Sequence, residues 1–261
     1  MESTFIHLKI PLQEILRATN NFADENIIGK GGFGNVYKGQ VTHRGKLITD
    51  IAARRLDRRH GQGNVEFWTE ISMLSSLDHY VVEFIGYVDE KNEKIIINRD
   101  YNKGSLVMYL SDPKDEYWMP RLSGFEFAIK HPVERRNQIF LCDEAIGTQG
   151  YMDPADLKHG GVTNKSDVYS LGVVLFELLC GRKAKDDQDN RLLASLAKFH
   201  YRNGTLQDII DPDLWNQMSP ESFKCFSDAA YSCLEEERSQ RPNVEQVLSE
   251  LKKAIDFNIM C

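Results

Sequence analysis

Three glycines spaced G-x-G-x-x-G constrain this chain more than any other feature, because they lie between two segments with strand character. Gly29, Gly31 and Gly34 follow the apolar pair at 27–28 and precede the segment 36–41. Dinucleotide-binding folds share this spacing, but there the glycines lead from a strand into a helix. Here they lead into a second strand, which favours a hairpin that covers the phosphates of a nucleotide, since backbone without Cβ atoms can approach them closely. A hairpin turn without a ligand is the alternative.

The segments after this hairpin predict a small sheet with one helix. Three further strand candidates follow: 46–56, 82–88 and 94–98. The charged residues 89–93 are expected to form the turn between the last two. Helical periodicity over 65–77 places three apolar residues on one face: Phe67, Ile71 and Leu74. Five strands and one helix therefore predict an N-terminal lobe over about 22–101, preceded by a helical segment in 1–21 that starts at Pro11.

From Ser105 onward the pattern is mostly helical. Residues 166–179 predict a strongly apolar helix that ends at Gly181, and a last helix is expected to begin at Pro242. The chain thus reads as an α+β protein with a helical C-terminal lobe over about 102–257 and a tail at 258–261.

Charge and cysteine usage narrow the class of protein. The net charge of −7 offers no basic surface for nucleic acid or anionic lipid. The five cysteines are odd in number and form no Cys-x-x-Cys pair, as in a reduced, cytosolic protein. The longest apolar run, 171–180, is interrupted by Glu177 and is too short to span a bilayer. We therefore expect a cytoplasmic protein without nucleic-acid partners and without direct membrane insertion.

Several short motifs run in a fixed order along the chain. They are Ala18-Thr19-Asn20-Asn21-Phe22, the glycine segment 28–36, Ile85-Gly86-Tyr87, Gly104-Ser105-Leu106, 147–154, 165–170 and Arg241-Pro242. In this order, over nearly the whole chain from about Leu8, they resemble the cytoplasmic domains of plant receptor-like kinases, within the serine/threonine protein kinase superfamily. The resemblance implies a two-lobed, protein-kinase-like fold with ATP as the nucleotide.

Arginine stands where these kinases have lysine. Their third strand reads Val-Ala-Ile-Lys, and the matching stretch here is Ile51-Ala52-Ala53-Arg54. Arg54 keeps the charge and is expected to pair with Glu70 on the helix, but a planar guanidinium is wider than an ammonium and places its charge differently. Two roles for Arg54 stay open: a contact with phosphate, and an ion pair that only connects the helix to the sheet.

The kinase Asp-Phe-Gly motif, which binds metal, is Gly124-Phe125-Glu126 in this chain. Gly124 has no side-chain oxygen for magnesium, which is held through carboxylates. Glu126 carries a carboxylate two positions further on, and its recruitment to a metal would need a change in the backbone direction.

The catalytic loop is absent. No His-Arg-Asp sequence with a downstream Asn occurs in the 261 residues. The segment 105–114 runs directly into 115–123, which resembles the kinase turn and strand before Asp-Phe-Gly, so the missing block lies between about Asp112 and Asp115. The catalytic base and the second metal ligand are lost with it, and intact flanks resemble the loss of an exon.

Two further departures concern the C-terminal lobe. The kinases have Glu at the position of Ala155, where it pairs with the arginine that matches Arg241. We therefore expect Arg241 to lack a partner and the lobe to be loosened. In the kinases Asp167 caps the catalytic loop, and here it is expected to cap the apolar helix instead, in competition with Ser166.

These features predict a catalytically impaired, kinase-like (pseudokinase) signalling or scaffold module, with no catalytic and no metal-binding residue. ATP is the candidate ligand and nothing is expected to hold magnesium. The candidate nucleotide-binding residues are Ile28, Gly29, Gly31, Gly34, Val36, Arg54 and Glu70. The expected partner is an active kinase or a receptor complex, which recruits the protein to the inner face of the plasma membrane. Two alternatives stay open: a weakly active serine/threonine kinase that transfers the ATP γ-phosphate to protein through Arg54 and Glu126, and a non-functional product of exon loss.

Overall fold

The computed structural model describes the chain in ten stretches. They are 4–31, 34–43, 47–57, 63–77, 80–101, 104–106, 119–135, 138–141, 147–185 and 191–259. Contacts within the chain divide it into two units, the first with residues 1–104 and 115–130 and the second with residues 105–114 and 131–261. The junction at about Asp112 to Asp115, where the sequence predicts a missing block, lies outside the described residues.

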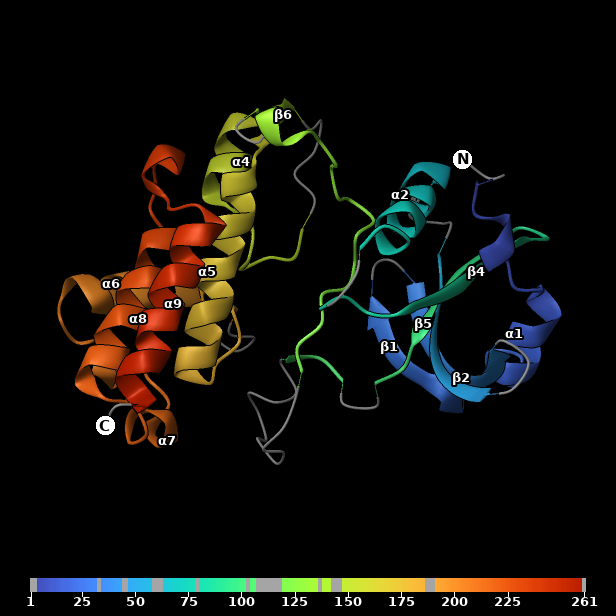
Figure 1. Cartoon of the computed structure of the whole chain (residues 1–261), viewed down its shortest axis with the longest axis horizontal. Helices are drawn as coiled ribbons and strands as arrows, with labels where there is room; N and C mark the ends of the chain where they lie inside the picture. The colour runs from blue at the N-terminus through green and yellow to red at the C-terminus, as the bar shows by residue number, and fades with distance from the viewer. Residues whose placement is uncertain are drawn as a thin grey trace. The chain divides into compact units, whose positions relative to one another are not determined.

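The first unit is built on a five-stranded antiparallel sheet with the order β1-β2-β3-β5-β4 (Figure 1). Its strands are β1 (Ile27–Gly31), β2 (Gly34–His43), β3 (Leu47–Arg55), β4 (Phe84–Glu90) and β5 (Glu93–Arg99). The five strands expected from the sequence are all present, and with the helices they confirm the α+β, kinase-like fold.

The turn between β4 and β5 is tighter than the sequence predicts. Only Lys91 and Asn92 lie outside the strands, and both have positive φ, 48° and 69°. Two consecutive residues in this conformation form a two-residue hairpin turn whose twist matches that of the strands. Glu90 and Glu93 therefore pair within the ladder, and the expected five-residue loop at 89–93 is wrong.

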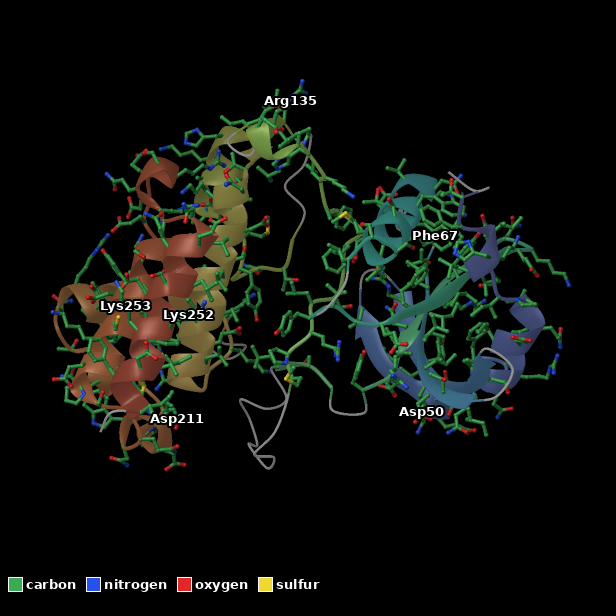
Figure 2. The ribbon with its side chains drawn as sticks, viewed as in Figure 1. Asp50, Phe67, Arg135, Asp211, Lys252 and Lys253 are labelled. Carbon is green, nitrogen blue, oxygen red and sulfur yellow. The ribbon has the colours of Figure 1, made fainter. Side chains whose placement is uncertain are left out.

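Each face of this sheet is covered by a different helix (Figure 1). Helix α1 (Leu12–Ala18) packs on one face through Leu12 and Ile15. Helix α2 (Asn64–Leu74) packs on the other face, where its apolar stripe meets Tyr87 and Ile96. Phe67, labelled in Figure 2, is 1% exposed in this second cluster. The alternation of side chains along β4 and β5 sends neighbouring residues to opposite clusters.

The second unit is helical. Its helices are α4 (Pro154–His159), α5 (Asn164–Cys180), α6 (Leu193–Arg202), α7 (Pro212–Trp215), α8 (Pro220–Cys233) and α9 (Val244–Ile259), with a two-stranded ladder of β6 (Phe140–Leu141) and β7 (Gly161–Val162). Its described 3-10 turns are η5 (Val133–Arg135), η6 (Leu206–Asp208) and η7 (Arg238–Gln240), whereas η2 (Ile6–Leu8) and η3 (Asp24–Asn26) belong to the first unit. Helix α5 supplies much of the core: Val173 and Phe176 are fully buried against residues of α6 and α8. In the described part of the chain no helix is both long and apolar enough to cross a membrane.

Helix α5 begins earlier than predicted, and its cap is a different residue. The N-cap is Thr163, whose hydroxyl accepts a hydrogen bond from the backbone N–H of Lys165 at 3.1 Å. The Ser166 hydroxyl accepts one from the backbone N–H of Thr163 at 3.0 Å. The sequence expectation that Asp167 caps this helix is wrong, since Asp167 already lies within its first turn. Gly181 ends the helix with φ 61°, as predicted.

Arg241 has a partner, contrary to the expectation drawn from Ala155. Asp153, two residues before Ala155, accepts hydrogen bonds from both terminal nitrogens of the Arg241 guanidinium, one of them at 2.8 Å. The two side chains are 1% and 0% exposed. Arg238 pairs with the adjacent Asp156 at 2.6 Å. The carboxylate lost at Ala155 is therefore replaced from the same turn, and the last helix begins at Val244 rather than at Pro242.

Candidate functional site

The glycine segment forms the predicted hairpin of β1 and β2. Gly29 lies opposite Val36, and Gly31 lies opposite Gly34. The tip of the hairpin, residues 32–33, lies outside the described residues. Ile28, at 47% exposure, stands on the same hairpin.

The three motif glycines differ in what the fold demands of them. Gly34 has φ +113°, and a Cβ atom there would overlap the carbonyl oxygen of Arg55. A Cβ at Gly29 would make only ordinary contact, at 3.5 Å from Val36, and one at Gly31 would meet nothing within 4 Å. Of these three glycines, only Gly34 is required by the packing of the described residues. At Gly29 and Gly31 the missing side chains leave the backbone open to a ligand.

Arg54 lies on β3 directly opposite Val36 on β2. Cross-strand partners project from the same face of a sheet, so the guanidinium lies on the face that α2 covers. There Arg54 forms the expected ion pair with Glu70 of α2, whose side chain is 2% exposed. The sheet and the helix are thereby connected through one partly buried charge pair.

A second carboxylate reaches the same guanidinium. Nη1 of Arg54 donates to Oε1 of Glu126 at 3.1 Å, while Nη2 donates to Glu70. The Arg54 and Glu126 side chains are 16% and 10% exposed. The sequence predicts Glu126 as a ligand to be recruited to a metal, or as a displaced catalytic group together with Arg54. No local pattern indicates their direct contact, because the two residues are 72 positions apart.

The residues before Glu126 hold the segment in position. Gly124 has φ +79°, a conformation that favours glycine. Phe125 packs against the aromatic cluster of α2 and the sheet. Within the described stretches, no group of three or more His, Cys, Asp or Glu residues is arranged to hold a metal ion.

The structure therefore brings Arg54, Glu70 and Glu126 into direct contact, with Val36 beside them on the sheet. The other candidates, Ile28, Gly29, Gly31 and Gly34, are placed on the hairpin strands rather than against the charged groups. With two carboxylates and one guanidinium, the charged cluster has a formal charge of −1.

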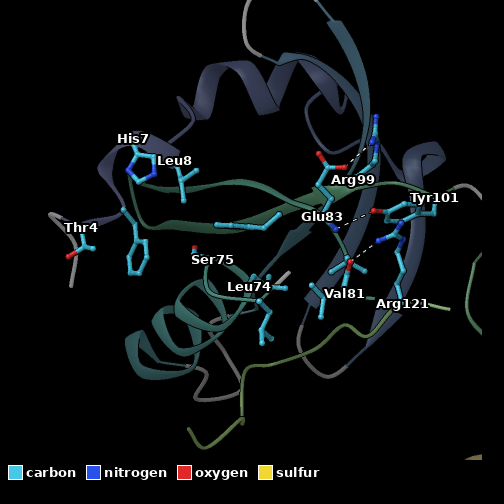
Figure 3. Close-up of a pocket in the computed structure, with 14 residues that line it drawn as sticks. Thr4, His7, Leu8, Leu74, Ser75, Val81, Glu83, Arg99, Tyr101 and Arg121 are labelled. Atoms are coloured by element: carbon cyan, nitrogen blue, oxygen red, sulfur yellow. Dashed lines mark hydrogen bonds and ion pairs between the residues drawn. The ribbon is translucent and has the colours of Figure 1, made fainter. Parts of the chain in front are cut away.

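A hollow elsewhere in the first unit, with a volume of about 670 Å³, is shown in Figure 3. Its charged groups are already engaged: Arg99 pairs with Glu83 at 2.8 Å, and Arg121 donates to the Val81 carbonyl at 3.1 Å and lies over the Tyr101 ring. None of the candidate nucleotide residues lines it, so it is separate from the candidate site.

Two protein-family models match the chain. The model described as "Protein kinase domain" matches residues 114–251, and the model described as "Protein tyrosine and serine/threonine kinase" matches residues 22–134. Together they extend over both units.

The chain is also similar to curated plant proteins, among them three from Arabidopsis thaliana. Receptor-like protein kinase ANXUR2 is 34% identical, over 95% of this chain and 34% of its own length. Receptor-like protein kinase ANXUR1 is 32% identical, over 95% and 34%. Receptor-like protein kinase THESEUS 1 is 32% identical, over 98% and 35%. The chain thus spans about a third of the length of these relatives.

The alignments are longer than the chain itself. The match to THESEUS 1 runs over 302 positions, whereas this chain has 261 residues. The relative therefore carries positions for which this chain has no residue.

Proposed function

Since this chain belongs to the protein kinase family but lacks several of the groups that perform phosphoryl transfer, we propose that it is a catalytically impaired, kinase-like signalling or scaffold module. The observation that carries the proposal is the capture of Arg54 by two carboxylates, Glu70 and Glu126, beside a glycine at the metal-binding position, Gly124. A module of this kind acts by presenting its surfaces to an active enzyme rather than by transferring phosphate.

The chemistry of phosphoryl transfer supports this proposal. The reaction depends on positioning and on charge stabilisation by metal ions, a lysine and a catalytic aspartate. The loss of a single general base or charge-stabilising group typically costs about 10²–10⁴ in rate, or roughly 3–5 kcal/mol. Here the base, the first metal ligand and the lysine are all replaced or missing in the sequence. The effects of these losses on the rate do not add simply, yet each of them alone lowers the rate greatly.

The alignment lengths support the loss of a block. Relatives have positions that this chain lacks, and the order of the motifs places the break before Gly124, where the His-Arg-Asp sequence is missing. Loss of the catalytic loop and replacement of the metal ligand are independent changes, so a variant that reverses one of them still carries the other.

ATP remains the candidate ligand of the hairpin. Protein kinases use ATP, and the open backbone at Gly29 and Gly31 supports a contact with a nucleotide, since packing explains neither glycine. Magnesium has no equivalent support, because Gly124 supplies no carboxylate. We therefore propose ATP without magnesium as a structural ligand.

The first test is phosphate transfer. With ATP labelled in its γ-phosphate and with magnesium or manganese, we expect no transfer to the protein itself or to generic protein substrates. The variant Gly124→Asp, which restores the metal ligand, is expected to stay inactive because the catalytic base is still missing. Transfer that disappears in Arg54→Ala would instead support a weakly active kinase that uses its displaced groups.

The names of the relatives support a proposal for the partner and the location of the module. The relatives are named as receptor-like kinases, so we propose an active receptor-like kinase as partner, at the cytoplasmic face of the plasma membrane. The kinase region of ANXUR2 serves as a bait for the purified chain in a binding assay. We expect saturable binding, and no binding by a denatured sample of the same chain; absence of binding to several such kinase regions would count against this class of partner.

A further inference from the structure

We propose that Glu126 acts as an internal anion that occupies Arg54 in place of nucleotide phosphates, so that ATP competes with this contact for the guanidinium. The inference rests on the proposed function, in which the hairpin takes a nucleotide without transferring phosphate. It assigns to Glu126 the role of setting the affinity of the site.

The geometry allows both carboxylates to bind the guanidinium at once. Glu70 uses Nη2 and Glu126 uses Nη1, the latter at 3.1 Å. Both terminal nitrogens of Arg54, the ones that an approaching phosphate would engage, therefore already donate to carboxylate oxygens. Other N–H groups of the guanidinium remain, since it carries five, but a phosphate that uses both terminal nitrogens in the usual forked manner competes with the two carboxylates already bound there.

Burial identifies Glu126 as the carboxylate that yields. Glu70 lies on α2 with 2% of its side chain exposed, whereas Glu126 is 10% exposed and belongs to the irregular segment after Gly124. Oε2 of Glu126 is buried and has no hydrogen-bond partner among the described residues. A buried carboxylate oxygen without a donor is costly, so the bound position of Glu126 is less stable than a fully satisfied ion pair.

The contrast with Asp153 in the second unit supports this assignment. There both carboxylate oxygens accept hydrogen bonds from Arg241, and one also accepts from the backbone N–H of Ala155. That pair is fully satisfied and has the properties of a permanent structural contact. The Arg54–Glu126 pair has one hydrogen bond and one orphaned oxygen.

Electrostatics give the direction of the effect. The cluster of Arg54, Glu70 and Glu126 has a formal charge of −1, and phosphates bring further negative charge to it. In an ordinary kinase the lysine and its helix glutamate sum to zero. Neutralising Glu126 should therefore strengthen the binding of an anionic ligand and weaken the repulsion that it meets.

The test compares two variants that remove the same charge from opposite faces of one sheet. Glu126→Gln keeps the shape and the oxygen that faces Arg54. Glu93→Gln is the matched control, because Glu93 pairs with the neighbouring Arg55, at 2.6 Å, on the face opposite to Arg54. ATP itself is titrated by calorimetry, in EDTA and again with magnesium.

We expect Glu126→Gln to bind ATP at least about tenfold more tightly than the natural protein, in EDTA as well as in magnesium, and Glu93→Gln to bind like the natural protein. A variant Glu126→Gly, which restores the residue of other kinases, should show the same gain. Circular dichroism and thermal unfolding establish that each variant is folded.

Equal ATP affinity in the natural protein and in both Glu126 variants would overturn the inference, and Glu126 would then be a tether with no effect on the ligand. Absence of ATP binding in all of them at millimolar concentration would overturn it as well. Absence of binding would also remove ATP as the proposed structural ligand, but neither result affects the proposal of a catalytically impaired module, which fails instead if the natural protein transfers phosphate.

Discussion

Replacing Asp153 by asparagine is expected to destabilise the second unit by about 3–5 kcal/mol, because breaking a buried ion pair leaves an uncompensated charge. Arg241 keeps its guanidinium buried, at 1% exposure of its side chain, and loses the ionised partner that accepts from both of its terminal nitrogens. Its remaining hydrogen bonds are to backbone carbonyls, such as that of Glu235 at 2.7 Å. Urea unfolding followed by circular dichroism measures the loss.

The control for this variant is an exposed ion pair in the same unit. Lys253 and Glu250 contact each other at 2.6 Å on α9, where solvent screens both charges. Glu250→Gln is therefore expected to change the unfolding midpoint little. If Asp153→Asn were as mild as Glu250→Gln, the buried pair would have no structural importance.

Asp153→Asn is also expected to change how the stability of the protein depends on pH. Burial by itself would raise the pKa of the Asp153 carboxyl, but the hydrogen bonds from Arg241 and from the backbone of Ala155, with the charges of Arg241 and Arg238, hold its pKa below its usual value. A carboxyl with a lowered pKa in the folded state contributes stability that is present above its unfolded pKa and is lost as the pH falls through the folded pKa. The natural protein should therefore lose stability as the pH falls below 3.8, the ordinary pKa of an aspartate carboxyl. In Asp153→Asn this contribution is absent, so unfolding temperatures measured from neutral to acid pH should fall less steeply.

Replacing Gly34 by alanine is the second change with a large expected effect. The backbone at Gly34 has φ +113°, and the added Cβ would overlap the backbone of Arg55 on the neighbouring strand. Backbone strain and overpacking together predict a loss of about 2–5 kcal/mol in the first unit. Hydrogen exchange of the amides of β2 and β3 locates the loss, and urea unfolding gives its size.

Gly31→Ala is the matched control within the same motif. A Cβ at Gly31 meets nothing within 4 Å, so stability should change by no more than about 1 kcal/mol. If both variants unfolded equally easily, the distinction between a glycine required by packing and a glycine left open for a ligand would be lost.

The sequence placed secondary structure well where the pattern was repetitive, and less well at the ends of elements. The apolar stripe of Phe67, Ile71 and Leu74 predicted α2, and the segment 166–179 lies within α5. The sequence predicts the wrong residue as the cap of α5, since several polar residues near Thr163 have side chains able to cap. The sequence predicts too long a turn at Lys91, because no glycine marks the positive φ there.

The partners of the charged groups were harder to predict. The resemblance to kinases indicates that Ala155 removes a carboxylate, and it therefore predicts that Arg241 has no partner. In the structure Asp153 takes that role. The presence of Ala155 in the sequence does not reveal that Asp153, two positions earlier, binds the same guanidinium.

By itself the sequence determined the class of fold, the position of the glycine hairpin, and the absence of a His-Arg-Asp catalytic sequence, because periodicity and motifs are properties of neighbouring residues. Only the tertiary structure decided which carboxylate meets which arginine. Arg54 and Glu126 are 72 positions apart, and Arg241 and Asp153 are 88 positions apart. An ion pair forms wherever folding brings opposite charges within a few ångströms, whatever their separation along the chain, so these contacts follow from the packing of strands, helices and turns together.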